Sequence, residues 1–541
     1  MAETFFITTA IDYTNSAPHI GHAYEKVLAD VIARYHRLKG DNVFFLTGVD
    51  QHGQKVQQSA AKDGVPPAEF VKGITQKFVD LWEKLDVRYD RWAATTDPLH
   101  KKCVQGILQR LWDEKQIYKD KQAGYYSIRQ EQFLTDKERG PHGKFGPEWG
   151  EVEFREEENY YFKLSDYKDW LLGFLKSHSD FVIPTFRQAE LVTAVEKIGS
   201  DLCISRPKSR LDWGIELPFD NEFVNYVWFD ALTNYISFVG YDPKIGKYED
   251  QSHEFRGLWS NARQVIGKDI LIPAHGIYWP IMLKALDFPD DQMPKLLVHG
   301  WWNVSGAKIS KSEGNVIDPD ALAGKYSAET LRYYLMSDIA TGSDADFSEE
   351  RLIVRYSSDL GNKIGNLLNR TLTMTHRYQD GRLRQDLSGG LRPRVEYFVK
   401  AYCFCLDEFA IGGALDQTEG DPEESNLDQR QIYGGLGKVV SLAMEANRYV
   451  EQTSPWNLAK SNSIAQLNSV LYHLAESVRV IAILISPVLP KAAHGIFDQL
   501  NWKMELSGKQ ERFSLGDAEF GKLPDGHVVG KPVLLFPRIE L

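Results

Sequence analysis

Two histidines near the start of the chain have the spacing of a phosphate-binding pair. His19 and His22 lie three residues apart in the segment PHIGH, at the predicted beginning of a helix. At that position both imidazoles project to the side of the unpaired backbone N–H groups, which already favour phosphate. Gly21 lacks a Cβ atom, so a flat ring could lie against the backbone there. A histidine pair alone is equally typical of a solvated loop.

Two lysines with the same spacing occur much later, in the polar, glycine-flanked segment KISKSEGN. Lys308 and Lys311 follow a predicted strand that ends in two tryptophans. Mobile lysines in such a loop can follow the charge that builds on a polyphosphate during its displacement. A loop of lysine and serine is by itself most often solvated surface.

The elements around the first motif indicate a nucleotide-binding fold. Residues 5–11 are predicted to form a strand, residues 23–39 a helix and residues 43–49 a second, buried strand. A βαβ unit of this kind collects ligands at the carboxyl ends of its strands. Asp50 falls just past such an end, where its charge suits a substrate ammonium group, although an aspartate there can also cap a helix.

The pattern of elements divides the chain, which at 541 residues is too long for one compact core. Strand-like segments at 264–272 and 295–302 are expected to complete a parallel sheet. Short aromatic strands between them and the first unit indicate an inserted domain, and the chain becomes helical from about residue 327. We therefore predict an α/β domain in two halves, 1–115 and 226–326, an insertion at 116–225 and a helical domain at 327–541; residues 413–430 are expected to form a solvated loop.

Composition excludes several classes of protein. The chain is 43% hydrophobic and 26% charged, with no stretch near the ~18 consecutive apolar residues of a membrane helix. The N-terminal sequence MAETFFITTAIDYT has no features of an export signal, which indicates a cytoplasmic protein that does not enter a membrane. The net charge of -12 has the wrong sign for bulk attraction to nucleic acid, so any such site must be local.

In this order, PHIGH and KISKS resemble the HIGH and KMSKS signatures of class I aminoacyl-tRNA synthetases. The surrounding segments TTAIDYTNSAPHIGHAYE, VDQHG, YVWFDALTNY, IGKDI, WWNVSGAKISKSEGN and SPWNLAK are similar to the methionyl-tRNA synthetase family across nearly the whole chain. The resemblance implies a Rossmann-like parallel-sheet catalytic domain, an inserted connective domain and an all-α anticodon-binding bundle. It also implies formation of methionyl-adenylate from methionine and Mg-ATP, followed by transfer to the 3′ adenosine of tRNA(Met).

The resemblance assigns the catalytic roles around ATP to the two motifs. His19, His22, Lys308 and Lys311 would embrace the phosphates. The implied ATP-binding residues are Tyr13, Asn15, His19, Gly21, His22, Lys268, Asp269, Lys308, Ile309, Ser310 and Lys311. Ile309 stands where the family usually has methionine, and both side chains are apolar.

A helical stripe of Trp228, Ala231, Leu232 and Tyr235 is the implied wall of a methionine pocket. Periodicity alone favours ordinary core for this stripe. The resemblance instead adds Asp50 as the ammonium ligand and completes the pocket with Ile11, Tyr13, His275 and Tyr278. Aromatic edges contact sulfur favourably, and a Tyr hydroxyl or a His can sense it as a weak acceptor. Asp12 departs from many relatives, which have proline there.

The helical domain contains the implied anticodon site. Residues 359–370 have an apolar stripe opposite a polar stripe that includes Asn366 and Arg370, and a polar stripe is usually only a solvated face. The resemblance implies that Asn366, Arg370 and Trp456 read the unpaired anticodon, by hydrogen bonds to base edges and by stacking on the indole.

The inserted domain bears on which amino acid is the substrate and on whether the chain binds structural zinc. Its ~110 residues are too few for a full editing domain, which favours methionine or cysteine over the branched amino acids. Many relatives carry a zinc knuckle of C-x-x-C pairs, but residues 124–149 contain no cysteine and only one histidine, His142. We therefore expect no structural zinc, which argues against a cysteine-specific enzyme.

Two alternatives remain at this stage. Another HxGH nucleotidyltransferase would not need the Asn366, Arg370 and Trp456 set, and an inactive synthetase-like RNA-binding protein should have lost a motif residue or Asp50. Many relatives also append a C-terminal OB-fold that dimerises. Because the chain ends at KPVLLFPRIEL directly after the bundle, we expect a monomer.

Overall fold

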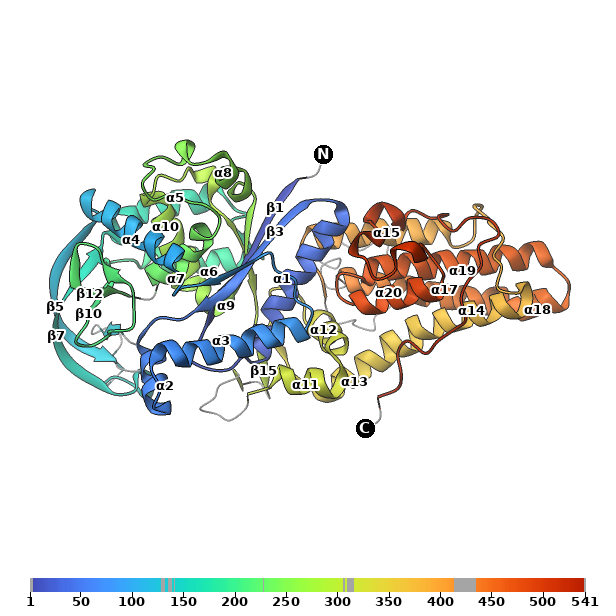
Figure 1. The fold of residues 1–541 in the computed structure, drawn as a ribbon, viewed down its shortest axis with the longest axis horizontal. Coiled ribbons are helices and arrows are strands. Elements are labelled where there is room, and N and C mark those ends of the chain that lie inside the picture. Colours follow the sequence, from blue (N-terminus) through green and yellow to red (C-terminus); the bar gives the residue numbers. More distant parts are fainter. Residues whose placement is uncertain are drawn as a thin grey trace.

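The computed structural model describes residues 3–127, 132–134, 139–140, 142–226, 228–304, 307–308, 316–412 and 434–539. The molecule is elongated, with an α/β part at one end and a helical bundle at the other (Figure 1). Helices α1 and α12 lie between these two parts (Figure 1). The two motifs predicted to bind phosphate and the implied anticodon residues are therefore carried by different parts of the molecule.

A parallel sheet forms the centre of the α/β part. Its strands follow the order β4-β3-β1-β13-β14-β8, and β2 pairs with the last residues of β3. The strands are β1 (Thr4–Thr9), β2 (Asp12–Tyr13), β3 (Asn42–Asp50), β4 (Arg91–Ala94), β8 (Val182–Ile183), β13 (Ala262–Gly267) and β14 (Lys295–His299).

The two faces of this sheet are buried against different helices. Neighbouring residues of each strand alternate between the two cores: Phe5 packs with α1 (Ile20–Lys39), and Phe6 packs with the opposite layer. That layer contains α4 (Pro98–Asp113), α7 (Trp228–Ser237) and α10 (Trp279–Ala285). The crossovers after β1 and β13 thus leave on opposite faces, and the carboxyl ends of these two neighbouring strands form the switch point where such sheets bind ligands.

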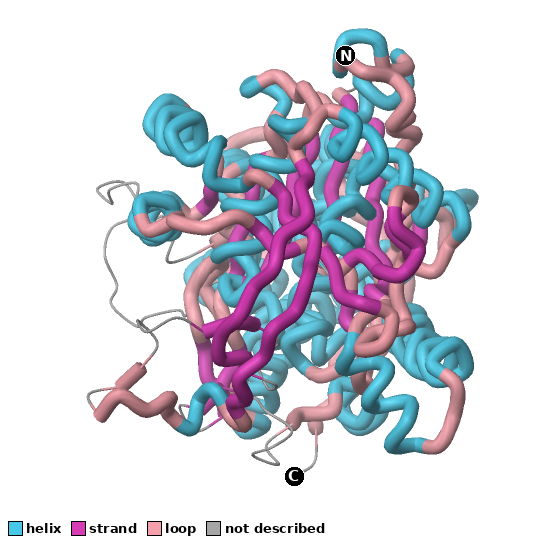
Figure 2. Tube along the Cα trace, turned by 90° about the vertical axis from the view of Figure 1, so that its left-hand side faces the viewer, coloured by secondary structure: helices cyan, strands magenta, loops and turns pink. Residues whose placement is uncertain are grey.

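The range 116–225 is built around a long antiparallel ribbon. Strands β5 (Ile117–Ser127) and β7 (Val152–Phe162) pair along their full length and face the viewer in Figure 2. β6 (Gln132–Leu134) and β9 (Leu202–Cys203) flank them, and β10 (Ser205–Pro207), β11 (Glu216–Leu217) and β12 (Asp220–Asn225) form a second small sheet. Helices α5 (Lys168–Ser177) and α6 (Thr185–Glu196) follow the ribbon. Between them β8 pairs with β14, so this range also supplies an edge strand to the central sheet.

Three predicted boundaries differ from the observed ones. The strand predicted at 264–272 ends at Gly267, and α9 (Lys268–Ile270) continues through a helical run, Leu271–Tyr278, into α10. An apolar run of this length does not distinguish strand from helix by periodicity. The strand predicted at 295–302 ends at His299, where a Cβ on Gly300 would lie 1.9 Å from the Ser343 carbonyl oxygen.

Beyond that close approach the chain enters a separate small sheet of β15 (Trp302–Val304), β16 (Ala307–Lys308) and β17 (Ala345–Asp346). The third difference is that α1 begins at Ile20 rather than Ala23, because the His19 side chain caps it.

The C-terminal part is helical, as predicted. Its helices are α11 (Pro319–Tyr326), α12 (Ala328–Ser337), α13 (Glu349–Arg355), a helical run Tyr356–Gly365 that continues into α14 (Asn366–Gln379), α15 (Arg392–Asp407), α17 (Gly435–Thr453), α18 (Pro455–Lys460), α19 (Ile464–Ile485) and α20 (Pro490–Gln499). The expected loop at 413–430 lies outside the described residues.

Among the described helices, α19 alone is long and apolar enough to cross a membrane, and 89% of its most apolar window is buried inside the protein. That burial is expected of the central helix of a bundle.

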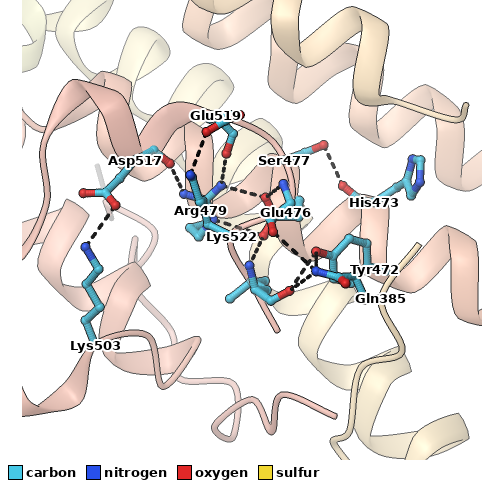
Figure 3. Close-up of polar contacts among 12 residues, drawn as sticks. Gln385, Tyr472, His473, Glu476, Ser477, Arg479, Lys503, Asp517, Glu519 and Lys522 are labelled. Carbon is cyan, nitrogen blue, oxygen red and sulfur yellow. Dashed lines mark hydrogen bonds and ion pairs between the residues drawn. The ribbon is translucent and has the colours of Figure 1, made fainter. Parts of the chain in front are cut away.

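An ion pair on α19 anchors the segment that follows the bundle. Glu476 and Arg479 are completely buried, with 2.6 Å between Oε2 and a guanidinium nitrogen (Figure 3). The carboxylate also accepts hydrogen bonds from the backbone N–H groups of Gly521 and Leu523, each at 2.7 Å. Arg479 in turn donates to the carbonyl of Glu519 at 2.7 Å. These bonds hold the C-terminal segment along the helix.

Candidate active site

The histidines of the first motif form a reciprocal cap at the start of α1. Nδ1 of His19 accepts the backbone N–H of Gly21, and Nδ1 of His22 accepts the backbone N–H of His19, both at 3.1 Å. A neutral imidazole that accepts at Nδ1 carries its hydrogen on Nε2. The cap therefore presents both rings in the tautomer that can donate from Nε2 to a phosphate oxygen at this helix end.

Gly21 is required by this cap. A Cβ at position 21 would lie 2.9 Å from Cε1 of His19, which is closer than side chains pack. The sequence suggested room for the flat ring of a ligand against the Gly21 backbone. In the structure the ring that lies there is the imidazole of His19. The two imidazole centroids are 3.8 Å apart.

The second motif lies mostly outside the described residues. The backbone of Lys308 ends β16, paired with Asn303 of β15, whereas Ile309, Ser310 and Lys311 are not described. The chain then returns to the first motif, because the N–H of Ile20 donates to the carbonyl of Ile317 at 3.2 Å. This hydrogen bond joins the start of α1 to the segment that follows the second motif, nearly three hundred residues later in the sequence.

Lys268 and Asp269 lie at the carboxyl end of β13, in the first turn after Gly267. Nζ of Lys268 is 2.5 Å from Oδ2 of Asp344 and lies 4.0 Å from the centre of the Trp301 ring. Asp269 is exposed at the switch point. Asn15 follows β2 at the same edge of the sheet.

Asp50 is a buried carboxylate with little hydrogen bonding. It is the last residue of β3 and is 6% exposed. Oδ1 accepts from the His52 backbone N–H at 3.4 Å and from the Thr95 hydroxyl at 3.5 Å, both near the limit for a hydrogen bond. Burial first, and then the nearby charge of Asp230, raise the pKa of Asp50 well above its usual value. A buried carboxylate so poorly compensated is suited to a cationic ligand.

Most residues of the predicted methionine pocket lie on α7 and on the helical run before α10. Ala231, Leu232 and Tyr235 are buried on α7, and Trp228 is partly buried at its start. Ile11 and Tyr278 pack at the edge of the same core, and Tyr13 lies opposite Asp50 in the β2–β3 pair.

Two polar residues of the predicted pocket, His275 and Tyr235, are hydrogen-bonded to each other. Nδ1 of His275 is 3.0 Å from the Ile270 carbonyl oxygen, so it carries the ring hydrogen and donates. Nε2 then accepts from the Tyr235 hydroxyl at 2.7 Å. Burial lowers the pKa of His275 to about 4, so the ring is neutral. The tyrosine hydrogen points to His275, and its oxygen is left as the acceptor.

A buried network beside Asp50 was not predicted. Asp230 on α7 bonds Nδ1 of His52 at 2.7 Å and Nε2 of His100 at 2.8 Å. His100, on α4, also contacts the Ser237 hydroxyl at 2.8 Å. His52 and Asp230 lie within the family-like segments VDQHG and YVWFDALTNY, but His100 lies in an ordinary helical sequence with no signal of its own.

The predicted anticodon residues gather at the bundle. Asn366 is exposed at the first position of α14, and Arg370, one turn later, forms an ion pair of 2.7 Å with Glu451 of α17. Trp456, five residues further on α18, is partly buried against the bundle core. Lys363, which precedes α14, pairs with Asp359 at 2.7 Å.

A parallel sheet with a histidine-capped helix at its switch point, joined to the segment after a lysine motif, has the catalytic architecture of a class I aminoacyl-tRNA synthetase. The model of the family described as tRNA synthetases class I (M) matches residues 5–145 and 148–372. A second model, described as the anticodon binding domain of methionyl tRNA ligase, matches residues 421–540. The chain therefore belongs to the methionyl-tRNA synthetase family of class I.

Individual relatives are similar to this chain over its full length. The chain is 40% identical to a methionine–tRNA ligase of Caldanaerobacter subterraneus, covering 100% of this chain and 80% of that protein. It is 38% identical to a methionine–tRNA ligase of Rickettsia bellii over 100% of both chains.

The solved structure of Mycobacterium tuberculosis methionyl-tRNA synthetase in complex with methionyl-adenylate matches with a TM-score of 0.84 and 32% identity, covering 99% of this chain and 100% of that one. The predicted fold class is confirmed.

Proposed function

We propose that the carboxyl edge of the central sheet activates methionine with Mg-ATP and then transfers it to the 3′ adenosine of tRNA(Met). The proposal assigns activation to residues 1–115 and 226–326, a connective role to 116–225 and anticodon binding to 327–541. Family membership supports the reaction, since the relatives are methionine–tRNA ligases and one matching structure holds methionyl-adenylate.

The observation that carries the residue assignment is Asp50. Its carboxylate is buried and, among the described residues, accepts only two hydrogen bonds, both long. It lies close enough to α7 for the charge of Asp230 to raise its pKa. The α-ammonium group of an amino acid supplies the positive charge that this site lacks. We assign the side chain of methionine to the pocket formed by Ile11, Tyr13, Trp228, Ala231, Leu232, Tyr235, His275 and Tyr278.

The first reaction needs the ATP phosphates to be held and their charge neutralised. The Nε2–H groups of His19 and His22 are assigned to phosphate oxygens at the start of α1, and Lys308 and Lys311 to the departing pyrophosphate. Mg²⁺, which arrives with ATP, adds positive charge on the phosphates. The methionine carboxylate attacks the α-phosphorus and pyrophosphate leaves. The remaining assigned ATP contacts are Tyr13, Asn15, Gly21, Lys268, Asp269, Ile309 and Ser310.

In the second reaction a ribose hydroxyl of the terminal adenosine attacks the methionyl carbonyl carbon, and AMP leaves. We assign Asn366, Arg370 and Trp456 to the anticodon, so correct tRNA is recognised far from the chemistry. A role in tRNA charging implies action in the cytoplasm, and a monomeric state remains our expectation.

Amino-acid-dependent exchange between ATP and pyrophosphate tests the proposal directly. We expect exchange with methionine and little with cysteine, leucine or valine. Asp50→Ala should raise the methionine KM by at least about 100-fold, because losing the partner of a buried charge costs about 3–5 kcal/mol, with little change in the KM for ATP.

The exposed Asp63→Ala serves as the matched control and should behave as wild type. Equal exchange with cysteine or leucine would refute methionine as the substrate, and a normal methionine KM in Asp50→Ala would refute the role of Asp50.

A further inference from the structure

The site contains two buried carboxylates with opposite surroundings. Asp230, 1% exposed, has each oxygen engaged by an imidazole, at 2.7 Å from His52 and 2.8 Å from His100. Burial alone would disfavour its charge, but the two histidines hold the pKa of Asp230 at about 2. His100 is itself fixed by Ser237 and stacks on Phe238 at 5.7 Å. Asp230 is thus a permanently placed negative charge.

Asp50 has no such support. The groups that face it are the Tyr13 backbone pair on β2, Thr95 after β4, the His52 backbone and the charge of Asp230 on α7. The His52 ring, which could have compensated Asp50, is turned to Asp230 instead. In the described part of the chain, no lysine or arginine forms an ion pair with Asp50. Its pKa is raised by burial and by Asp230.

Two carboxylates in one poorly solvated site do not ionise equally, and their surroundings decide which of them keeps a proton. Here the two imidazoles assign the charge to Asp230. The proton therefore resides on Asp50 when no cation is bound. An ammonium ion beside Asp50 reverses that preference, because it provides the opposite charge that the site lacks.

We propose that methionine binding releases one proton from Asp50, and that Asp230 is the positioning residue that creates this exchange. The Asp50 carboxylic acid transfers its proton to solvent water. The resulting carboxylate pairs with the methionine ammonium group, which keeps its own protons. The exchange favours ligands that carry a full positive charge at this position. This inference rests on the proposed role of Asp50 as the ammonium ligand.

Calorimetric titration of the full chain with methionine in two buffers of different ionisation enthalpy, such as phosphate and Tris, counts the protons released. For wild type we expect release approaching one proton at pH values below the pKa of Asp50 in the free protein, and less release above it. The methionine Kd should fall by up to tenfold for each unit that the pH rises, until Asp50 is ionised in the free protein.

Variants distinguish the loss of proton release from a general loss of stability. Asp230→Asn keeps the shape but removes the charge, so proton release and the pH dependence of Kd should both decrease over this range. Asp50→Asn should release no proton. Asp359→Asn, a buried aspartate of the bundle, is the matched control and should change stability without changing proton release.

The outcomes distinguish this inference from the proposed function. If methionine supports exchange and Asp50→Ala abolishes binding, but the wild-type enthalpy is the same in both buffers, the proton exchange is overturned and the function stands. If release is unchanged in Asp230→Asn, the role of Asp230 is overturned. The wild-type buffer comparison decides the first point even where a variant does not fold.

Discussion

Asp12, between Ile11 and Tyr13, is a third buried aspartate near the proposed pocket, besides Asp50 and Asp230. It is 4% exposed, and Oδ1 lies 2.8 Å from Nζ of Lys26. The same ammonium group also bonds Oε1 of Glu25 at 2.8 Å and the Ala10 carbonyl at 2.9 Å. One lysine is thus shared by two acids inside the protein, and Oδ2 of Asp12 has no hydrogen-bond partner among the residues that the structure describes.

This arrangement predicts a pH-dependent stability that Asp12→Asn removes. Burial raises the pKa of Asp12 to about 7 despite Lys26. Because the folded pKa exceeds the unfolded one, the contribution of protonated Asp12 is complete below about pH 4 and is lost as the pH rises through 7. The free energy of unfolding of wild type relative to Asp12→Asn should therefore fall between about pH 4 and 7, by up to about 1.4 kcal/mol per pH unit, and level off at higher pH.

Urea unfolding at several pH values measures this difference. The exposed Asp63→Asn should follow wild type at every pH. Parallel curves for wild type and Asp12→Asn would contradict a raised pKa.

At the residue scale, motif spacing located the phosphate and ammonium groups but not their hydrogen bonds. His19 and His22 were predictable because they are close in sequence and cap one helix. The pairing of Asp230 with His52 and His100 was not, because it joins three segments that only the folded sheet brings together. Such contacts cannot be predicted from the neighbouring sequence, and for this reason nothing in the sequence indicated that His100 on α4 contacts Asp230.

Among the elements, α19 has an apolar sequence pattern that does not predict the polar contacts made by two of its residues. Its sequence is that of a core helix, yet Glu476 and Arg479 inside it bind the backbone of the C-terminal segment (Figure 3). The element type was predictable from its period, whereas the partner segment, more than forty residues later, was not. In the opposite direction, the apolar run at 264–272 was misassigned because a short buried run fits either period.

Glu476→Gln should therefore destabilise the protein strongly. The change leaves Arg479 buried without a negative partner, which costs about 3–5 kcal/mol. Glu445→Gln is the control, because its pair with Arg448 at 3.1 Å is partly solvated and contributes about 0–1 kcal/mol. Thermal unfolding of the two variants measures the contrast. Similar melting temperatures for both would show that the buried pair does not hold the C-terminal segment.

The β5–β7 ribbon is a second element with a testable chemistry. Near its tip the Arg139 guanidinium lies 4.7 Å from the ring centres of both Tyr125 and Phe145. In the described residues, no group of three or more His, Cys, Asp or Glu side chains is arranged to hold a metal ion. An arginine in contact with two adjoining aromatic rings stabilises this tip without metal.

We accordingly predict that no stoichiometric zinc copurifies with the protein. Elemental analysis after expression in zinc-supplemented medium measures the ratio, with a known zinc protein purified in parallel as the control. One zinc per chain, lost on chelation together with activity, would show that the ribbon was misinterpreted.

For the molecule as a whole, the α/β part and the helical bundle are joined by a buried group of hydrogen bonds around Arg332, and not by a linker alone. Arg332 on α12 pairs with Asp30 of α1 at 2.7 Å. It also donates to the carbonyls of Leu85 at 3.0 Å, Pro487 at 2.9 Å and Val488 at 2.8 Å. A completely buried guanidinium with four partners fixes the bundle against the α/β part. The sequence predicted both parts but not this junction, whose partners, from Asp30 to Val488, lie more than four hundred residues apart.

A rigid junction between distant sites predicts that activation and tRNA charging separate by mutation. Trp456 lies on α18, at the end of the bundle far from the sheet (Figure 1). An indole that stacks on a base contributes about 1–3 kcal/mol, so Trp456→Ala should reduce charging efficiency roughly tenfold to a hundredfold. Pyrophosphate exchange without tRNA should stay near wild type, and the preference for the native anticodon should weaken.

The competing account is that Trp456 acts only in packing, since it is partly buried against the core. Loss of a packed tryptophan costs about 3–5 kcal/mol of stability, and exchange and charging would then fall in parallel with the melting temperature. Phe404→Ala, on a 38% exposed aromatic of α15, controls for general effects on the bundle. Charging of tRNA with native and altered anticodons decides between the accounts, because only stacking on the anticodon makes the defect depend on the anticodon sequence.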